Sequence, residues 1–266
     1  MHHAPDGTRY ALTGPQEASA VVLVHGLGLN QASWQWTVPA LQHDYRVLTY
    51  DLFGHGQSAR PPQAPALSVF SNQLAGLLDH CEIESAVVAG FSLGGMIARR
   101  FAQDAPQRTR ALMILHSPHR RSTAAQAAVL KRVALAHAHG PDATVEEALE
   151  RWFTDAFRAA EPELMDQVRG WVKANDPAVY DSIYRVLADG VDEVIAPDPP
   201  ITCPALVITG DEDFGNGPEM ARAIADEITG AQLRILPGLR HMALAENPAA
   251  FNTVLRAFLA DLERGA

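Results

Sequence analysis

Gly90-Phe91-Ser92-Leu93-Gly94 stands between an apolar run, Ala86–Ala89, and a helical pattern that continues through Phe101. A strand that turns directly into a helix presents Ser92 at the tip of a sharp, strained bend, where small neighbours are needed because the backbones crowd. A helix N-terminus also favours developing negative charge. We therefore predict that Ser92 is a nucleophile. The alternative is a structural serine in a glycine-rich turn.

Six short apolar runs alternate with helix-length segments along the chain, which has no visible internal repeat. They are residues 20–24, 47–50, 86–89, 112–115, 205–209 and 233–236. Strands separated by helices pair in parallel through crossovers, so we predict an α/β fold with a mostly parallel sheet flanked by helices. Arg9–Thr13, which follows the turn signal Pro5-Asp6-Gly7, is expected to add an antiparallel edge strand.

The spacing of strands breaks between Leu115 and Ala205, where roughly ninety residues contain no convincing strand. A connection of that length is far longer than a usual βα loop, so it predicts an inserted helical cap. Four helical patterns fill it: 124–139, 145–159, 163–175 and 178–187. We expect residues 1–117 and 201–266 to form the core and residues 118–200 to form the cap.

Composition excludes several classes of protein. The 266 residues include 21 Lys and Arg against 31 Asp and Glu, and the formal charge of −10 argues against a nucleic-acid partner. Two cysteines cannot make a disulfide framework or a zinc site. No signal peptide pattern and no run of about 18 apolar residues occurs, so we expect a soluble, cytoplasmic protein without a membrane partner. Its oligomeric state, including a homo-oligomer, stays open.

A serine nucleophile needs a base, and the base needs an orienting acid. His241 follows the last predicted strand by five residues, in a loop that can place its side chain over the carboxyl ends of the strands. We predict that His241 is the base. His25 and His55 lie beside glycines and are expected to organise loops by hydrogen bonds. His2 and His3 are expected to be disordered or solvated.

The acid should come from a strand end between the serine and the histidine in the chain. The segment His116–Arg121, after the strand 112–115, contains no carboxylate. The segment after the strand 205–209 contains three, and Asp213 is predicted because a tight turn at Gly210 lets the residue three positions later point toward His241. Asp211 is the alternative acid, and its structural role would be a hydrogen bond to the turn.

The negative oxygen of a tetrahedral intermediate needs preorganised backbone donors. The N–H of Leu93, directly after the nucleophile, is one candidate. The glycine-rich loop His25-Gly26-Leu27-Gly28 follows the strand 20–24 and is expected to supply the second from Leu27. A glycine pair in such a loop also suggests a dinucleotide site, but the full six-residue fingerprint is absent. We therefore expect neither a cofactor nor a metal.

Together these motifs resemble the α/β-hydrolase superfamily, in its order and spacing, over nearly the whole chain. They are His25–Gly28, Asp51–Ser58, Gly90–Met96, Gly210–Asp213 and Gly238–Met242. Within the superfamily, Arg151-Trp152-Phe153-Thr154 and Leu93–Met96 are similar to 3-oxoadipate enol-lactonases. The resemblance implies a Ser-His-Asp hydrolase acting on a small molecule through an acyl-enzyme.

Departures from the resemblance bear on the substrate. His116–Arg121 differs from the segment that enol-lactonases usually carry at this place, which leaves the substrate open. Hydrolases that cleave C–C bonds usually carry His-Trp where this chain has His241-Met242. Dehalogenases and epoxide hydrolases use an Asp nucleophile, and Ser92 excludes both mechanisms.

The start of the predicted cap is basic. Between Ser117 and Asp142 the chain has four cationic residues, Arg120, Arg121, Lys131 and Arg132, and no acidic one. Either they form a solvated helix face, or Arg120 and Arg121 meet an anionic substrate. Trp152 is a further candidate for the substrate pocket, against the alternative of core packing, because caps shape specificity in such a fold.

Three function classes remain open at this point. The first is a serine hydrolase that cleaves an ester or lactone, with carboxylate-bearing molecules among its candidate substrates. The second uses the same residues on a ketone, amide or thioester, or in cofactor-free haloperoxidation. The third is a non-catalytic ligand receptor, against which the complete set of Ser92, Asp213 and His241 argues.

Overall fold

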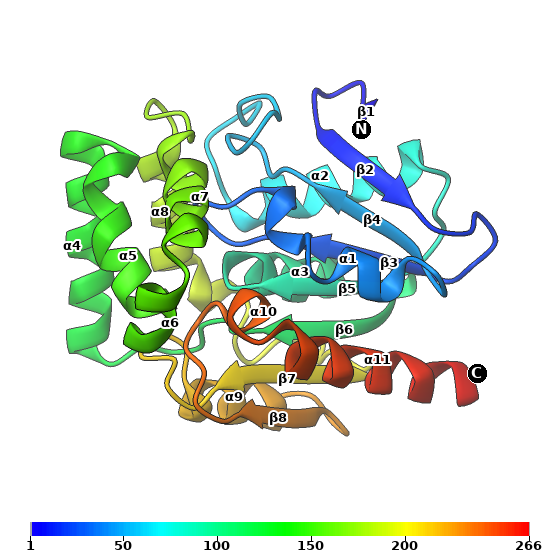
Figure 1. The fold of residues 1–266 in the computed structure, drawn as a ribbon. Helices are drawn as coiled ribbons and strands as arrows, with labels where there is room; N and C mark the ends of the chain where they lie inside the picture. Colours follow the sequence, from blue (N-terminus) through cyan, green and yellow to red (C-terminus); the bar gives the residue numbers. More distant parts are fainter. Residues whose placement is uncertain (1, 266) are drawn as a thin grey trace.

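The computed structural model describes residues 2–265, and eight strands in the order β1-β2-β4-β3-β5-β6-β7-β8 form its central sheet (Figure 1). From β4 through β8 all neighbouring strands are parallel, while β2 is antiparallel to β4. The predicted α/β fold is therefore confirmed. The strands are β1 (His2–His3), β2 (Arg9–Thr13), β3 (Ala20–Val24), β4 (Arg46–Tyr50), β5 (Ala86–Phe91), β6 (Thr109–Leu115), β7 (Ala205–Gly210) and β8 (Gln232–Leu236).

The antiparallel end of the sheet differs from the prediction in one respect. β2 pairs with β4 as expected, but β1 lies outside it, with His2 opposite Tyr10 and His3 opposite Arg9. Both histidines are exposed, so their side chains are solvated as predicted. Of the two predicted states, disordered or solvated, they adopt the second, because their backbone pairs with β2.

Helices cover both faces of the sheet because its strands are apolar on both sides. In β3, Val22 and Val24 point into one core cluster, and Val21 and Leu23 point into the other. One face packs against α2, α3 and α9, and the other against α1 and α11. These core helices, with the short α10, are α1 (Val38–Leu41), α2 (Leu67–His80), α3 (Leu93–Asp104), α9 (Pro218–Asp226), α10 (Ala243–Glu246) and α11 (Pro248–Arg264).

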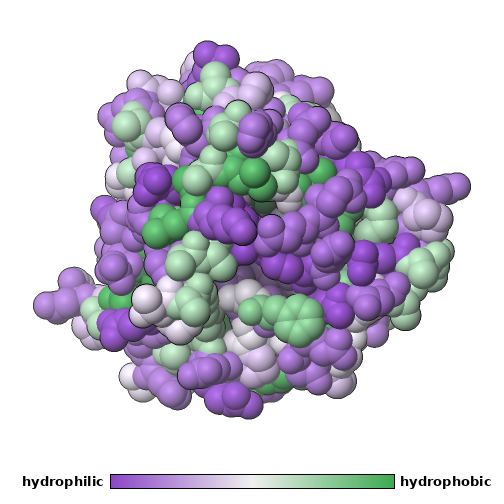
Figure 2. Space-filling view, turned by 90° about the vertical axis from the view of Figure 1, so that its left-hand side faces the viewer, coloured by the Kyte–Doolittle hydropathy of each residue, from purple (hydrophilic) through white to green (hydrophobic). Residues whose placement is uncertain are grey.

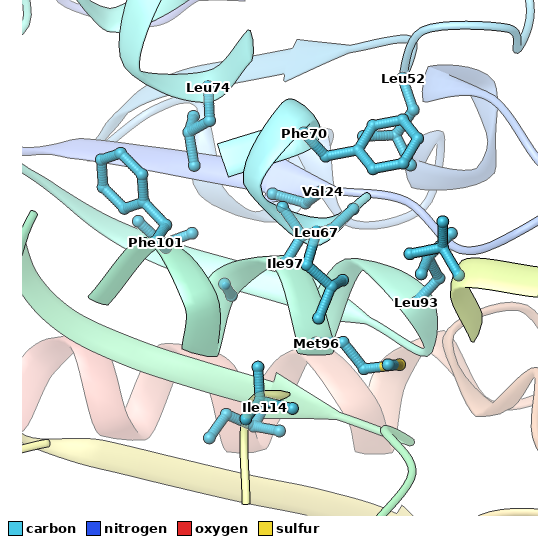
Figure 3. Packing of buried hydrophobic residues seen from close by; sticks show 14 of the residues in the cluster. Val24, Leu52, Leu67, Phe70, Leu74, Leu93, Met96, Ile97, Phe101 and Ile114 are labelled. Atoms are coloured by element: carbon cyan, nitrogen blue, oxygen red, sulfur yellow. The ribbon is translucent and has the colours of Figure 1, made fainter. Parts of the chain in front are cut away.

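The helix that follows Ser92 is fixed by packing against α2. Phe70 and Leu74 of α2 lie in the same buried cluster as Ile97 and Phe101 of α3, and all four side chains are fully buried (Figure 3). Close packing of this kind leaves little room for α3 to shift. The position of Ser92 at the start of α3 is therefore set by the core.

Five α-helices fill most of the long connection between β6 and β7 and lie together at the end of the sheet where the parallel strands finish (Figure 1). They are α4 (Thr123–His139), α5 (Val145–Trp152), α6 (Asp155–Ala160), α7 (Pro162–Lys173) and α8 (Tyr180–Asp189). We call this segment the cap. The predicted boundaries between core and cap, at residues 117/118 and 200/201, stay a prediction.

The prediction of one continuous helix in the cap is wrong. The pattern 145–159 was expected to be continuous, but α5 ends at Trp152 and α6 starts at Asp155. Phe153 adopts an extended backbone, with φ −126° and ψ 147°, and its side chain is fully buried. Thr154 then caps α6, because its hydroxyl accepts a hydrogen bond from the N–H of Phe157 at 3.3 Å. No helix within residues 2–265 has the length and apolar character needed to cross a membrane.

Candidate active site

Ser92 occupies a strained bend between β5 and α3. Its φ of 56° and ψ of −115° lie in a region that L-residues rarely adopt. A Cβ on Gly90 would lie 2.1 Å from the carbonyl oxygen of Gly94, and one on Gly94 would lie 2.2 Å from that of Val24. Both positions therefore require glycine, which is the physical reason for the Gly-x-Ser-x-Gly pattern.

His241 and Asp213 are joined by a short hydrogen bond. His241 lies between β8 and α10, Asp213 lies after β7, and the distance from Nδ1 to Oδ2 is 2.7 Å. The other carboxylate oxygen, Oδ1, accepts the N–H groups of Gly215 and Asn216, both at 3.0 Å. Burial alone would raise the pKa of Asp213, but the neighbouring histidines, His241 first, outweigh it and hold this pKa well below its usual range.

Asp211, the alternative acid, lies elsewhere. It is exposed, and its Oδ1 accepts the N–H of Gly238 at 2.7 Å. The structural role predicted for Asp211 was a hydrogen bond to its own turn, but the observed bond joins it to the loop after β8 instead. The structure brings Asp213, not Asp211, to His241.

Ser92, Asp213 and His241 line one cavity of about 190 Å³ between the sheet and the cap. Within residues 2–265 the Ser92 hydroxyl makes no hydrogen bond, so its relation to His241 rests on their shared cavity. Trp152, a predicted substrate contact, also lines the cavity, and its ring centroid lies 6.3 Å from that of His241. Further lining residues include Gly26, Leu27, Leu29, Phe91, Val129, Thr144, Tyr180, Tyr184, Phe214 and Asn216.

The glycine-rich loop after β3 passes directly beside the nucleophile. A Cβ on Gly26 would lie 3.1 Å from the Cβ of Ser92. In the described chain the Leu27 N–H has no hydrogen-bond acceptor, while Gly28 donates to His55 and Leu29 donates to Gly26. Leu93 is the first residue of α3, where backbone N–H groups have no partner within the helix.

Two buried histidines hold this loop in place, as the sequence predicted for His25 and His55. His25 donates from Nδ1 to the Gly26 carbonyl at 2.8 Å and accepts the Leu52 N–H at Nε2. His55 accepts the Gly28 N–H at 3.1 Å. Burial lowers the pKa of His25 to about 4 and that of His55 to about 3, so both are neutral at pH 7.

Three arginines line the cavity, against one carboxylate, Asp213. Arg121 donates to the carbonyls of Leu187 and Ala188 at the end of α8, and burial lowers its pKa to about 10. Arg132 donates to the Tyr184 hydroxyl at 3.0 Å. The third is Arg151. Arg120, the other predicted contact, is exposed and does not line the cavity.

Arg151 was missed at the sequence level. It stands four residues after Glu147, which is the spacing of an ordinary surface ion pair on a helix. In the described chain its only polar contact is that pair, from Nε to Glu147 at 3.6 Å, and its Nε is buried without a hydrogen bond. Burial, followed by repulsion from Arg132, lowers the pKa of Arg151. Its guanidinium therefore has donors free to meet a ligand.

The sequence reasoning also does not find His116, because it expects only a carboxylate to act at the strand end after β6. Its Nδ1 lies 3.0 Å from the Asp213 oxygen that also contacts His241. The ligand atoms of these three residues lie within 4.8 Å of one another, a spacing that metal ligands can share. Here the two nitrogen–oxygen distances are those of hydrogen bonds. The signal available in the sequence was the position of His116 at a strand end beside β7.

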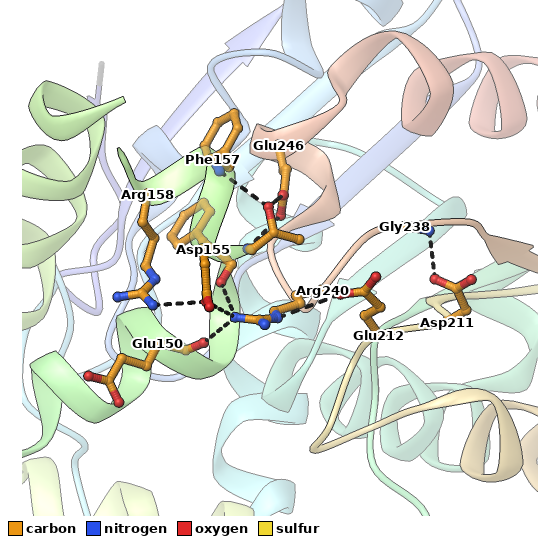
Figure 4. A network of polar contacts seen from close by, with 11 residues as sticks. Glu150, Asp155, Phe157, Arg158, Asp211, Glu212, Gly238, Arg240 and Glu246 are labelled. Atoms are coloured by element: carbon orange, nitrogen blue, oxygen red, sulfur yellow. Dashed lines mark hydrogen bonds and ion pairs between the residues drawn. The ribbon is translucent and has the colours of Figure 1, made fainter. Parts of the chain in front are cut away.

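The loop that carries His241 is fastened to the cap. Arg240 donates to the carbonyls of Glu150 and Phe153 and to the carboxylate of Asp155 (Figure 4). On the other side of His241, Met242 donates its N–H to the Trp152 carbonyl at 2.9 Å. Contacts on both sides of His241 thus tie this loop to the end of α5.

The surface at the cap end is mainly hydrophilic, with separate hydrophobic patches (Figure 2). Phe214 is 70% exposed, lines the cavity, and lies with its ring centroid 4.9 Å from the Arg240 guanidinium carbon. The rim of the cavity thus combines an aromatic ring with a cation.

Comparison with known proteins agrees with this geometry. A model of the alpha/beta hydrolase family matches residues 21–254. The (E)-2-((N-methylformamido)methylene)succinate hydrolase of Acinetobacter baylyi is 28% identical over 245 residues, which cover 91% of each chain. The 3-oxoadipate enol-lactonase 2 of the same organism is 27% identical over 250 residues, covering 94% of this chain and 92% of its own.

A solved structure of a hydrolase is similar over nearly the whole chain. The enol-lactonase from Burkholderia xenovorans superposes with a TM-score of 0.88 at 28% identity, covering 95% of this chain and 96% of its own. The family model spans most of the chain, and the strand order and the serine bend agree with it. The chain therefore belongs to the α/β hydrolase family and is a hydrolase.

Proposed function

We propose that this chain is a serine hydrolase that cleaves an ester or lactone through an acyl-enzyme. Ser92 attacks the carbonyl carbon while His241 accepts the hydroxyl proton at Nε2. Asp213 holds the other nitrogen of His241 as a donor, which fixes the tautomer that a base requires. The N–H groups of Leu27 and Leu93 receive the negative oxygen.

The second half of the reaction uses the same groups. His241 returns the proton to the leaving alkoxide oxygen as the carbonyl re-forms and the C–O bond breaks. His241 then takes a proton from water, whose oxygen attacks the acyl carbon, and returns it to Ser92 as the acid product leaves. No cofactor is needed for this sequence.

One observation carries the proposal: a serine on a strained bend and a histidine bonded to a buried carboxylate line the same small cavity. The test is Ser92→Ala on purified protein with p-nitrophenyl esters, lactones and enol-lactones. We expect hydrolysis to fall by orders of magnitude with the melting temperature nearly unchanged, and a fluorophosphonate probe to label wild type alone. Comparable hydrolysis by the variant would refute the covalent mechanism.

We further propose that the substrate carries a carboxylate that binds Arg151. The cavity places three guanidinium charges against one carboxylate, and Arg151 alone among the three has no hydrogen bond in the described chain. A partly desolvated guanidinium pairs strongly with a carboxylate. The names of the relatives in Acinetobacter baylyi, a substituted succinate hydrolase and an oxoadipate enol-lactonase, support an anionic substrate.

Matched pairs of esters, one anionic and one neutral, test whether Arg151 binds a carboxylate of the substrate. Arg151→Met keeps much of the side-chain length and removes the donors, so kcat/KM should fall by about ten- to a hundredfold on the anionic ester only. Arg120→Met, at an exposed position outside the cavity, is the matched control and should leave both rates unchanged. Equal losses on both esters in Arg151→Met would refute the carboxylate contact.

A further inference from the structure

Asp213 accepts a hydrogen bond from a second imidazole besides that of His241. His116 follows β6 directly, its side chain is fully buried, and its Nδ1 lies 3.0 Å from Asp213 Oδ2. With Gly215 and Asn216 on Oδ1, the carboxylate has four nitrogen neighbours at hydrogen-bond distance. Four is about the full accepting capacity of a carboxylate.

The backbone at His116 is built to hold this contact. Its φ of 49° lies in the left-handed region, which histidine adopts more often than most residues but still at a cost. Its carbonyl accepts the side-chain amide of Asn216 at 2.8 Å, and its N–H donates to Ile208 of β7 at 2.7 Å. A strained residue bonded on both sides to the neighbouring strand and its loop is positioned by the fold.

The burial of His116 selects its protonation state. Its Nε2 is buried and has no hydrogen-bond partner among residues 2–265. A charged imidazolium would leave an unpaired N–H there, at the cost of an unsatisfied buried donor. Burial lowers the pKa of His116, although Asp213 opposes this shift. His116 is thus the neutral tautomer that donates from Nδ1.

We propose that His116 is a positioning residue for the reaction, which fixes the Asp213 carboxylate against His241 and withdraws part of its negative charge. The inference rests on the proposed function, because it gives Asp213 the role of orienting the base. His116 itself does not line the cavity, so its effect reaches the substrate through Asp213.

The expected electrostatic effect has a definite sign. A carboxylate that loses one of its donors directs more of its negative charge toward its remaining hydrogen-bond partner, so removal of the His116 donor should shift the acid side of the pH–rate profile to higher pH. The titratable or charged groups that act on His116 and Asp213 in the described chain are each other, His241 and, at longer range, Arg151. The Thr209 hydroxyl lies 3.4 Å from His116 Nδ1, while the rings of Phe91 and Phe251 are uncharged.

Two variants distinguish the hydrogen bond that His116 donates to Asp213 from the packing of its ring. His116→Leu removes the donor, and His116→Asn keeps one, because the asparagine amide nitrogen is as many bonds from the backbone as Nδ1. Asparagine also tolerates the left-handed backbone. His119→Asn, in the same segment but paired with Glu227 at 2.9 Å, is the matched control.

The pH profile of kcat/KM is the readout, with folding checked by near-ultraviolet circular dichroism and active sites counted by fluorophosphonate labelling of Ser92. In His116→Leu we expect kcat/KM to fall about ten- to a hundredfold, and its acid limb to move to higher pH by about half a unit or more. His116→Asn should have most of the wild-type kcat/KM, and the acid side of its pH profile should lie at the wild-type pH. His119→Asn should match wild type in both.

Two results would overturn the inference. One is a folded His116→Leu with wild-type rate and profile. The other is an equal loss of kcat/KM in His116→Leu and His116→Asn with no shift of the acid side of the pH profile. That result would assign His116 to packing alone. Should Ser92→Ala keep its activity, the proposed function itself fails, and that result is read independently of both His116 variants.

Discussion

Replacement of Asp213 by asparagine tests how the carboxylate organises the site. The carboxylate accepts two backbone N–H groups at Oδ1 and two imidazole nitrogens at Oδ2. An amide offers one acceptor oxygen and one NH₂ group in the same space. With its oxygen toward Gly215 and Asn216, its NH₂ faces His241 and His116, whose Nδ1 atoms must then become acceptors.

That rearrangement sets the size of the expected losses in rate and in stability. His241 with a proton on Nε2 cannot accept one from Ser92, and loss of the orienting acid costs serine proteases about 10⁴ in turnover. We expect a loss of similar size in Asp213→Asn. The switched His116 carries an N–H at its buried, unpartnered Nε2, which should lower the free energy of unfolding by about 1 to 3 kcal/mol.

The assay is kcat/KM on an activated ester together with urea unfolding at several pH values. Because the pKa of Asp213 is depressed in the folded chain, its contribution to stability is present above the ordinary aspartate pKa of about 3.9 and is lost as the pH falls through the folded value. The stability gap between wild type and Asp213→Asn should therefore narrow in acid. A rate loss below about tenfold, or a larger loss in Asp211→Asn, would refute the assignment of Asp213.

Three further predictions follow from single contacts. Gly94→Ala should lower the free energy of unfolding by about 1 to 3 kcal/mol, measured in urea, because its Cβ would meet the Val24 carbonyl at 2.2 Å; wild-type stability would contradict the crowding argument. Since burial keeps His55 neutral, wild-type stability should decline as the pH falls from about 6.5 toward 3, and His55→Gln should decline less steeply. Arg240→Met should lower kcat as well as the melting temperature, because it removes the side-chain bonds that hold one side of the His241 loop to the cap; an unchanged kcat would show that these bonds serve the cap alone.

Several features could be predicted from the sequence because local chemistry decides them. The strand–turn–helix around Ser92 is specified by glycines at positions where a Cβ would meet backbone atoms, and the alternation of apolar runs with helices specifies the parallel sheet. The break at Phe153 could not be predicted, because the periodicity continues through it. Burial of that side chain and the Thr154 cap decide where α5 ends.

The α/β fold, and Ser92 and His241 as chemical candidates, could be predicted from local sequence alone, because each of these residues stands at a strand end that its neighbours in the sequence mark. The sequence also favoured Asp213 over Asp211 as the partner of His241, and the folded chain brings Asp213 to it. The sharing of that carboxylate oxygen by His116, and the position of Arg151 rather than Arg120 at the cavity, depend on the fold. The physical reason is that these contacts join strand ends and cap helices far apart in the chain. Packing of the cap on the sheet, rather than any local pattern, sets which side chains meet.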